Sequence, residues 1–202
     1  MALRLVLATA NLDKVREIER IFGEVGSIEL IDRPADVADV EETGATLLEN
    51  ARLKAQALVT ATGVAAVADD TGLSVDALDG APGVRSARFA GEHATYSENV
   101  GKVLAELDHV ADADRAARFS TVALISFPDG SEWSCEGVIE GAIARAPQGS
   151  EGFGYDPIFL PQGGDGRTFA EMTLEEKNAL SHRGRAFRSL AGLLAEAGLL
   201  AE

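Results

Sequence analysis

The feature that most constrains the fold is a mostly apolar segment of strand length, residues 2–9, interrupted only by Arg4 before it ends at Thr9, that passes directly into a helical pattern. In the segment 14–22, apolar residues recur at helical spacing and form one side of an amphipathic helix. A mostly apolar strand is typical of a strand buried on both faces, and a strand followed by a helix is typical of α/β proteins. We therefore interpret residues 2–9 as a buried first strand rather than as a secretion signal.

Later segments continue this alternation. Capping boxes at 46–49 and 95–98 each predict the start of a helix, and Gly63 predicts the end of the first of them near residue 62. Further strands are expected at 27–32, 64–68, 73–78, 118–127, 132–144 and 157–160, and helices at 173–180 and 181–197. The pattern predicts an α/β fold with a mixed twisted sheet, flanking helices and a β-rich second lobe, in one domain of residues 1–202.

Charge and cysteine content limit the partners. The net charge of −15 argues against a nucleic acid polymer, whose phosphates need a basic face. It leaves room for a small anion, because a few lysines and a metal ion can reverse the potential locally. The single cysteine, Cys135, is typical of a reducing compartment, so we expect a cytoplasmic protein. No segment approaches the roughly 18 apolar residues of a membrane span, so no membrane partner is expected.

The turn after the first predicted strand, residues 9–14, is the first candidate site. A helix N-terminus offers free N–H groups and partial positive charge, which suit a phosphate. Thr9 and Asn11 add neutral donors, and Lys14 adds a cation. The alternative is that Asn11 or Asp13 simply caps the helix.

Adjacent acids form the second candidate site. The apolar run 64–68 ends on Asp69 and Asp70, which we expect in a turn with Thr71 and Gly72 before the next strand. Carboxylates at the end of a buried strand can bind Mg²⁺ through oxygen, and one of them can accept a proton from a water near the metal. An ordinary Asp-rich turn is the alternative.

The acidic stretch 36–42 is expected to be a solvated loop for most of its length. Glu42 is the exception, because it directly precedes the helix that carries Lys54. There it could supply a second metal oxygen, while Lys54 reaches a phosphate. Asn50 and Lys54 are four residues apart and are expected on one face of that helix.

Two groups near the C-terminus are suited to a flat ring. Phe153 lies between two glycines, which allow the backbone to approach a ligand while the ring stacks on it. The alternative is a turn with a core phenylalanine. Lys177, His182 and Arg183 surround a helix start and could donate to purine carbonyl oxygens or phosphates, although a capped helix with surface charges would have the same sequence.

Each of these motifs is weak alone, but their order along the chain is specific. They are Thr-x-Asn-x-x-Lys at 9–14, Glu-Glu-Thr-Gly at 41–44, Glu-Asn-Ala-x-x-Lys-Ala at 49–55, Ala-Asp-Asp-Thr-Gly at 68–72, Gly-Ala-Pro-Gly-Val-x-Ser-Ala-Arg at 80–88, Gly-Phe-Gly-Tyr-Asp-Pro at 152–157, Glu-Glu-Lys at 175–177 and Ser-His-Arg-Gly at 181–184. Over nearly the whole chain this series closely resembles the inosine/xanthosine triphosphate pyrophosphatase family, which removes deaminated purine nucleotides from the precursor pool.

The resemblance implies a two-lobed homodimer that hydrolyses ITP, dITP or XTP to the nucleoside monophosphate and pyrophosphate with Mg²⁺. It implies that Asp70 is the proton acceptor and a metal ligand, with Glu42 as a second metal contact. The residues implied to bind substrate are, for the phosphates, Thr9, Ala10, Asn11, Leu12, Asp13, Lys14 and Lys54, and for the base and sugar, Phe153, Gly154, Tyr155, Asp156, Lys177, His182 and Arg183. Thr71, also implied to bind substrate, stands where the family usually has serine and keeps the hydroxyl donor.

Two alternatives stay open. The first is a pyrophosphatase of modified pyrimidine or methylated nucleotides on a similar scaffold. The second is a nucleotide-binding module without activity. The acid pair beside Glu42 favours catalysis, because a pure anion binder would avoid such carboxylates.

Overall fold

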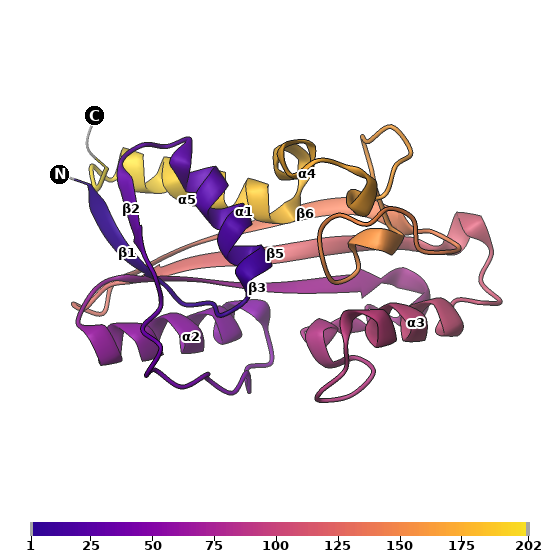
Figure 1. Cartoon of the computed structure of the whole chain (residues 1–202), viewed down its shortest axis with the longest axis horizontal. Coiled ribbons are helices and arrows are strands. Elements are labelled where there is room, and N and C mark those ends of the chain that lie inside the picture. The colour runs from indigo at the N-terminus through magenta and orange to yellow at the C-terminus, as the bar shows by residue number, and fades with distance from the viewer. Residues whose placement is uncertain (1, 201–202) are drawn as a thin grey trace. The chain divides into compact units, whose positions relative to one another are not determined.

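A computed structural model describes residues 2–200 of the chain (Figure 1). Its strands are β1 (Leu3–Leu7), β2 (Ile28–Ile31), β3 (Ala66–Val75), β4 (Pro82–Gly83), β5 (Ala116–Ser126), β6 (Glu132–Ile143) and β7 (Phe159–Pro161). They form a sheet in the order β2-β1-β3-β5-β6-β7, with β4 paired to β3. Because β1 is parallel to β2 and β3 while β4 and β7 are antiparallel to their neighbours, the sheet is mixed, and the predicted α/β class is confirmed.

The helices are α1 (Leu12–Gly23), α2 (Leu47–Thr62), α3 (Tyr96–Glu106), α4 (Leu174–Leu180) and α5 (His182–Glu196). Both predicted capping boxes are present. The Thr46 side chain accepts from the Glu49 N–H at the start of α2, and the Thr95 side chain accepts from the Glu98 N–H at the start of α3. Gly63 ends α2 with a left-handed backbone, φ 67°, as predicted. No helix in the described part of the chain is both long enough and apolar enough to cross a membrane.

Contacts divide the chain into two compact units. The first consists of Met1–Asp70, Thr121–Gly137 and Arg183–Glu202, and the second of Thr71–Ser120 and Val138–His182. Strands β3, β5 and β6 contribute residues to both units.

In the first unit, the side chains of β1 alternate between two cores. Leu5 and Leu7 pack with apolar residues of α1 and α5, whereas Val6 and Ala8 pack with α2. Figure 1 shows α1 and α5 on one side of these strands and α2 on the other. The first strand is therefore buried and apolar on both faces from Leu5 on, because both faces are covered there, as its sequence predicted.

The structure corrects the prediction for residues 64–78. Strand β3 continues without interruption from Ala66 to Val75, so Asp69 and Asp70 lie within a strand and not in a turn between two strands. Both acids are buried, with exposed fractions of 2% and 5%. The strand tolerates them because other parts of the first unit supply charged partners. Since neighbouring residues of a strand point to opposite faces, Asp69 lies on the α1/α5 face and Asp70 on the α2 face.

The core of the second unit is formed by the far half of β3 with β5, β6 and α3, and its central residues include Leu73, Val103, Phe119 and Phe159. Here the predicted strand 157–160 is wrong in its bounds. Asp156–Ile158 form a 3₁₀ turn, closed by the bond from Ile158 N–H to Tyr155 O, and β7 begins only at Phe159.

Candidate active site

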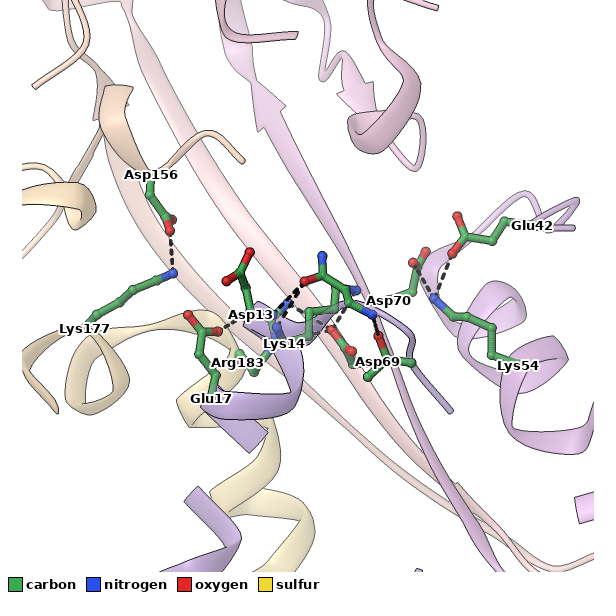
Figure 2. A network of polar contacts seen from close by, with 12 residues as sticks. Asp13, Lys14, Glu17, Glu42, Lys54, Asp69, Asp70, Asp156, Lys177 and Arg183 are labelled. Atoms are coloured by element: carbon green, nitrogen blue, oxygen red, sulfur yellow. Dashed lines mark hydrogen bonds and ion pairs between the residues drawn. The ribbon is translucent and has the colours of Figure 1, made fainter. Parts of the chain in front are cut away.

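The first group of the candidate site surrounds the ammonium of Lys54, in the first unit (Figure 2). The Nζ atom of Lys54, on α2, lies 2.9 Å from Asp70 Oδ1 on β3 and 2.9 Å from Glu42 Oε1 in the loop before α2. One turn earlier on the same helix face, Asn50 donates to Asp70 Oδ2 at 3.2 Å. The structure therefore brings Glu42, Lys54 and Asp70 into direct contact and adds Asn50 to them.

Burial and neighbouring charges shift the pKa values of Asp70 and Lys54. Burial raises the pKa of the Asp70 carboxyl above its ordinary value of 3.8, although Lys54 and Lys14 oppose the shift. Burial also disfavours the charged form of Lys54, but Asp70, Asp69 and Glu42 outweigh it, so the pKa of Lys54 is raised and the side chain stays an ammonium. A buried carboxylate of raised pKa is a better proton acceptor near neutral pH than an exposed aspartate.

Glu42 and Asp70 fit a divalent cation. Mg²⁺ takes oxygen ligands, commonly one or two carboxylates completed by waters and substrate phosphates. The two carboxylates direct oxygens at one positively charged atom, Lys54 Nζ, so they already face a common cation. Within residues 2–200, no cluster of three or more His, Cys, Asp or Glu side chains is arranged to hold a metal.

A second group lies on the other face of β3, where Asp69 joins two cations (Figure 2). Its Oδ2 atom accepts from Arg183 Nη2 at 3.0 Å and lies 3.1 Å from Lys14 Nζ. Arg183, near the start of α5, also donates to Glu17 on α1. Burial opposes the ionisation of Asp69, but Lys14 and Arg183 outweigh it and hold the pKa of Asp69 well below its ordinary value. This ion network connects β3, α1 and α5.

The turn 9–14 is organised by Asn11. Its Oδ1 atom accepts from the N–H groups of Asp13 at 2.9 Å and Lys14 at 3.3 Å. The capping alternative is therefore confirmed for Asn11, and α1 begins at Leu12 instead of residue 14. Thr9 Oγ1 in turn accepts from the Asn11 N–H at 3.2 Å.

One side of this turn lines a pocket of about 590 Å³. Thr9, Ala10, Leu12 and Val15 form that side, and residues from the loop 32–39 form the other. Lys14 points instead toward Asp69, and burial, only partly opposed by Asp69, lowers the pKa of Lys14. An anion near this turn would favour the charged form of Lys14.

In the second unit, Asp156 organises the glycine-rich turn. Its Oδ2 atom accepts from the Phe153 N–H at 2.8 Å and from Lys177 Nζ at 2.5 Å. The same ammonium lies 4.8 Å from the centre of the Phe153 ring. Gly152 has φ 70°, and a Cβ there would lie 2.2 Å from Asp156 Oδ2, so only glycine fits. Phe153 is half-buried and is not among the core residues of this unit, so the alternative of a core phenylalanine is wrong.

The charged residues near the C-terminus are not on the surface. Lys177, His182 and Arg183 are all 3% exposed or less, so the alternative of a helix with surface charges is wrong. The His182 ring stacks on Phe119 with centroids 4.5 Å apart. The Tyr155 hydroxyl, also buried, donates to Ser86 O at 2.8 Å.

Thr71 and Gly154 are the remaining predicted site residues. Thr71 follows Asp70 on β3 and is half-buried. Gly154 has φ 62° and open space where a Cβ would stand.

A model of the Ham1 family matches residues 5–193, which is most of the chain. The chain belongs to the Ham1 family. Its relatives include a dITP/XTP pyrophosphatase of Streptomyces coelicolor, 48% identical over 96% of this chain and 98% of the relative.

Solved structures agree with this membership. A HAM1 protein from Coxiella burnetii has a TM-score of 0.86 and 44% identity, over 96% of this chain and 99% of the other. A nucleoside-triphosphatase / dITP/XTP pyrophosphatase from Mycobacterium abscessus has a TM-score of 0.73 and 45% identity, over 95% and 97% of the two chains. The family and enzyme class expected from the motifs are thus confirmed by relatives of that description.

Two residues of this Ham1-family chain take part in the site although the sequence did not single them out as site residues. Glu17 lies one turn after Lys14 and holds Arg183. The feature of the sequence that could have indicated Glu17 is its position, as a carboxylate, on the buried side of α1. Asn50 was noted only for sharing a helix face with Lys54, and it contacts Asp70 directly.

Proposed function

We propose that this Ham1-family chain hydrolyses the non-standard purine nucleotides ITP, dITP and XTP to the nucleoside monophosphate and pyrophosphate, with Mg²⁺ as cofactor. The names of its relatives support the reaction class. The observation that carries the proposal is the pair of carboxylates, Glu42 and Asp70, whose oxygens both lie 2.9 Å from one cationic atom, Lys54 Nζ. Of the two, Asp70 is the proton acceptor, and burial raises its pKa.

In this proposal Asp70 is the general base. Its carboxylate takes a proton from a water whose oxygen bonds to phosphorus, and the bond between the α- and β-phosphoryl groups breaks with pyrophosphate as the leaving group. Lys14 and Lys54 offset the phosphate charge, together with the backbone N–H groups and side chains of residues 9–14. Mg²⁺ held by Glu42 and Asp70 would supply further charge neutralisation.

Base recognition is assigned to the group in the second unit. Phe153, Gly154, Tyr155 and Asp156 would line the base and sugar, with Thr71 as a hydroxyl donor. Hypoxanthine and xanthine carry a carbonyl oxygen at the six position, to which Lys177 or His182 could donate. Adenine carries an amino group there, so it would leave a buried donor unpaired at about 1–3 kcal/mol.

Arg183 stays in the proposed substrate-binding set on the strength of the resemblance. Its contacts with Asp69 and Glu17 give it a second task in the first unit. There it fixes the carboxylate that faces Lys14.

We further propose a cytoplasmic homodimer, the oligomer that the resemblance implies. We also propose that residues 1–202 act as one domain, because β3, β5 and β6 each contribute residues to both units. Light scattering on the purified protein tests the dimer. A molar mass of one chain would overturn it.

The activity is tested by pyrophosphate release from ITP, XTP, GTP, ATP and dUTP, with and without Mg²⁺. We expect rapid release from ITP and XTP in the presence of Mg²⁺ and little in EDTA. Fastest release from dUTP would support the pyrimidine alternative instead. Binding of ITP without release of pyrophosphate would support the inactive nucleotide-binding module.

A further inference from the structure

Asn50 joins two segments of the site through one buried amide. Its side chain is fully buried at the start of α2. The Oδ1 atom accepts from the Gly44 N–H at 2.8 Å, and Nδ2 donates to Asp70 Oδ2 at 3.2 Å. The orientation of the amide follows from chemistry, because a backbone N–H only donates and a carboxylate only accepts. Reversing the amide would lose both bonds.

The loop residue at this junction has to be a glycine. A Cβ at Gly44 would lie 2.6 Å from Asn50 Oδ1 and 2.7 Å from the Glu49 Cβ. The backbone of Gly44 is not in the left-handed region, so space is the requirement here and not conformation. The close approach of the loop to the Glu49 Cβ therefore adds a steric constraint to the hydrogen bonds at this junction.

Glu42 lies two residues before Gly44, so the junction also determines where the Glu42 carboxylate can reach. The Glu42 carboxylate forms an ion pair with Lys54. In the proposed function Lys54 turns its charge toward phosphate, which weakens its attachment to Glu42. The Asn50 amide is neutral and already committed to Gly44 and Asp70, so it is unaffected by the arrival of an anion.

We propose that Asn50 is a positioning residue: it holds the loop that carries Glu42 against Asp70, so that the two carboxylates face one divalent cation. This inference rests on the proposed function for the identity of the cation. The assignment of Asn50 itself rests on the contacts with Gly44 and Asp70.

The test compares Asn50→Leu with the wild-type enzyme, because leucine has a similar size and no polar atoms. Hydrogen exchange of the Gly44 amide reports the junction without any metal. Titration of Mn²⁺, followed by its electron paramagnetic resonance signal in the absence of nucleotide, reports the cation site. We expect faster exchange at Gly44 and a Mn²⁺ dissociation constant about 10–100-fold higher in Asn50→Leu. In assays of ITP hydrolysis by Asn50→Leu, the Mg²⁺ concentration that gives half-maximal rate should rise as the Mn²⁺ dissociation constant does. The KM for ITP at saturating Mg²⁺ should stay close to the wild-type value.

Asn99 offers a matched control in the second unit. It is also buried, and its amide also joins two segments: Oδ1 accepts from the Ala90 N–H at 2.8 Å and Nδ2 donates to Ala87 O at 3.0 Å. Asn99→Leu should speed exchange at Ala90 and leave Mn²⁺ affinity unchanged. Gly44→Ala provides a second variant of the junction that does not alter Asn50, and it decides the question if Asn50→Leu fails to fold.

Unchanged Gly44 exchange in folded Asn50→Leu, or unchanged Mn²⁺ affinity in folded Asn50→Leu or Gly44→Ala, would overturn the positioning role while leaving the proposed function standing. An equal loss of Mn²⁺ affinity in Asn99→Leu would also overturn it, since the effect would then be general destabilisation. A wild-type enzyme that binds no Mn²⁺ would overturn the metal site and this inference together.

Discussion

Arg183 donates two hydrogen bonds to one oxygen of Asp69, from Nη2 at 3.0 Å and from Nε at 3.3 Å, across 114 positions of sequence. Both side chains are at most 2% exposed. A buried pair of this kind repays the cost of removing charges from water only while both partners are present. The same guanidinium also contacts Glu17, so its loss would leave two buried carboxylates short of a cation.

Replacing Arg183 with methionine should therefore destabilise the protein strongly. We expect the free energy of unfolding to fall by about 3–5 kcal/mol, the usual effect of breaking a buried ion pair from one side. Urea denaturation measures it. Arg167→Met is the control, because Arg167 pairs with Asp165 and Glu176 at the surface and its removal should change stability little. Similar losses in the two variants would contradict the structural role of the buried network.

Asp70→Asn tests the general base. The amide keeps the size of the side chain but cannot accept a proton, so kcat for pyrophosphate release from ITP should fall by about 10²–10⁴-fold. Circular dichroism shows whether the variant is folded. A folded Asp70→Asn with wild-type turnover at saturating Mg²⁺ would exclude Asp70 from this role.

Gly152 and Gly154 make a matched pair in the turn that carries Phe153. Both have positive φ, 70° and 62°, so alanine at either position carries a backbone strain of about 1–2 kcal/mol. Only at Gly152 would the new Cβ meet Asp156 Oδ2. Gly152→Ala should displace the carboxylate that holds Lys177 and lower kcat/KM for ITP by up to about 10²-fold.

Gly154→Ala should show the smaller effect of strain alone. Steady-state kinetics of both variants with ITP make the comparison. Equal kcat/KM values for the two variants would mean that the position of Asp156 does not matter to the substrate.

Burial of Tyr155 makes the free energy of unfolding depend on pH in alkaline solution. Burial raises the pKa of its phenol above the ordinary value of 10, so the native state binds the phenolic proton more tightly than the unfolded chain does. The stabilisation is complete below pH 10 and is lost as the pH rises above that value. Tyr155→Phe removes this effect together with the hydrogen bond to Ser86 O, at a cost of about 1 kcal/mol near neutral pH.

Urea denaturation of both proteins at several pH values between 8 and 11 tests this dependence. The difference in free energy of unfolding between wild type and Tyr155→Phe should shrink above pH 10. A difference that is constant or that grows with pH would show that the native state does not favour the protonated phenol.

Features with local causes could be predicted from the sequence. The capping boxes at Thr46 and Thr95 and the helix end at Gly63 depend on residues within one turn, and the structure has all three. The shared face of Asn50 and Lys54 follows from a spacing of four on a helix, and both side chains reach Asp70.

Features that depend on residues distant in sequence could not be predicted. Adjacent acids at Asp69 and Asp70 locally favour a turn, because aspartate is rarely buried without partners. The partners that keep them in β3 come from α1, α2 and α5, and no local pattern shows those encounters. The burial of Lys177 has the same kind of cause, since its ion pair with Asp156 spans 21 positions.

The uninterrupted strand β3 also makes the site sensitive to chain length. It pairs with β1 in the register Val6 with Ala66 and Leu7 with Val67. Inserting one residue between Val67 and Ala68 would turn every later side chain to the opposite face. Asp69 would then face α2, and Asp70 would face α1 and α5, although the Ala-Asp-Asp-Thr-Gly motif would read the same. This Ham1-family chain should therefore tolerate substitutions just before the acid pair far more readily than the insertion of a single residue there.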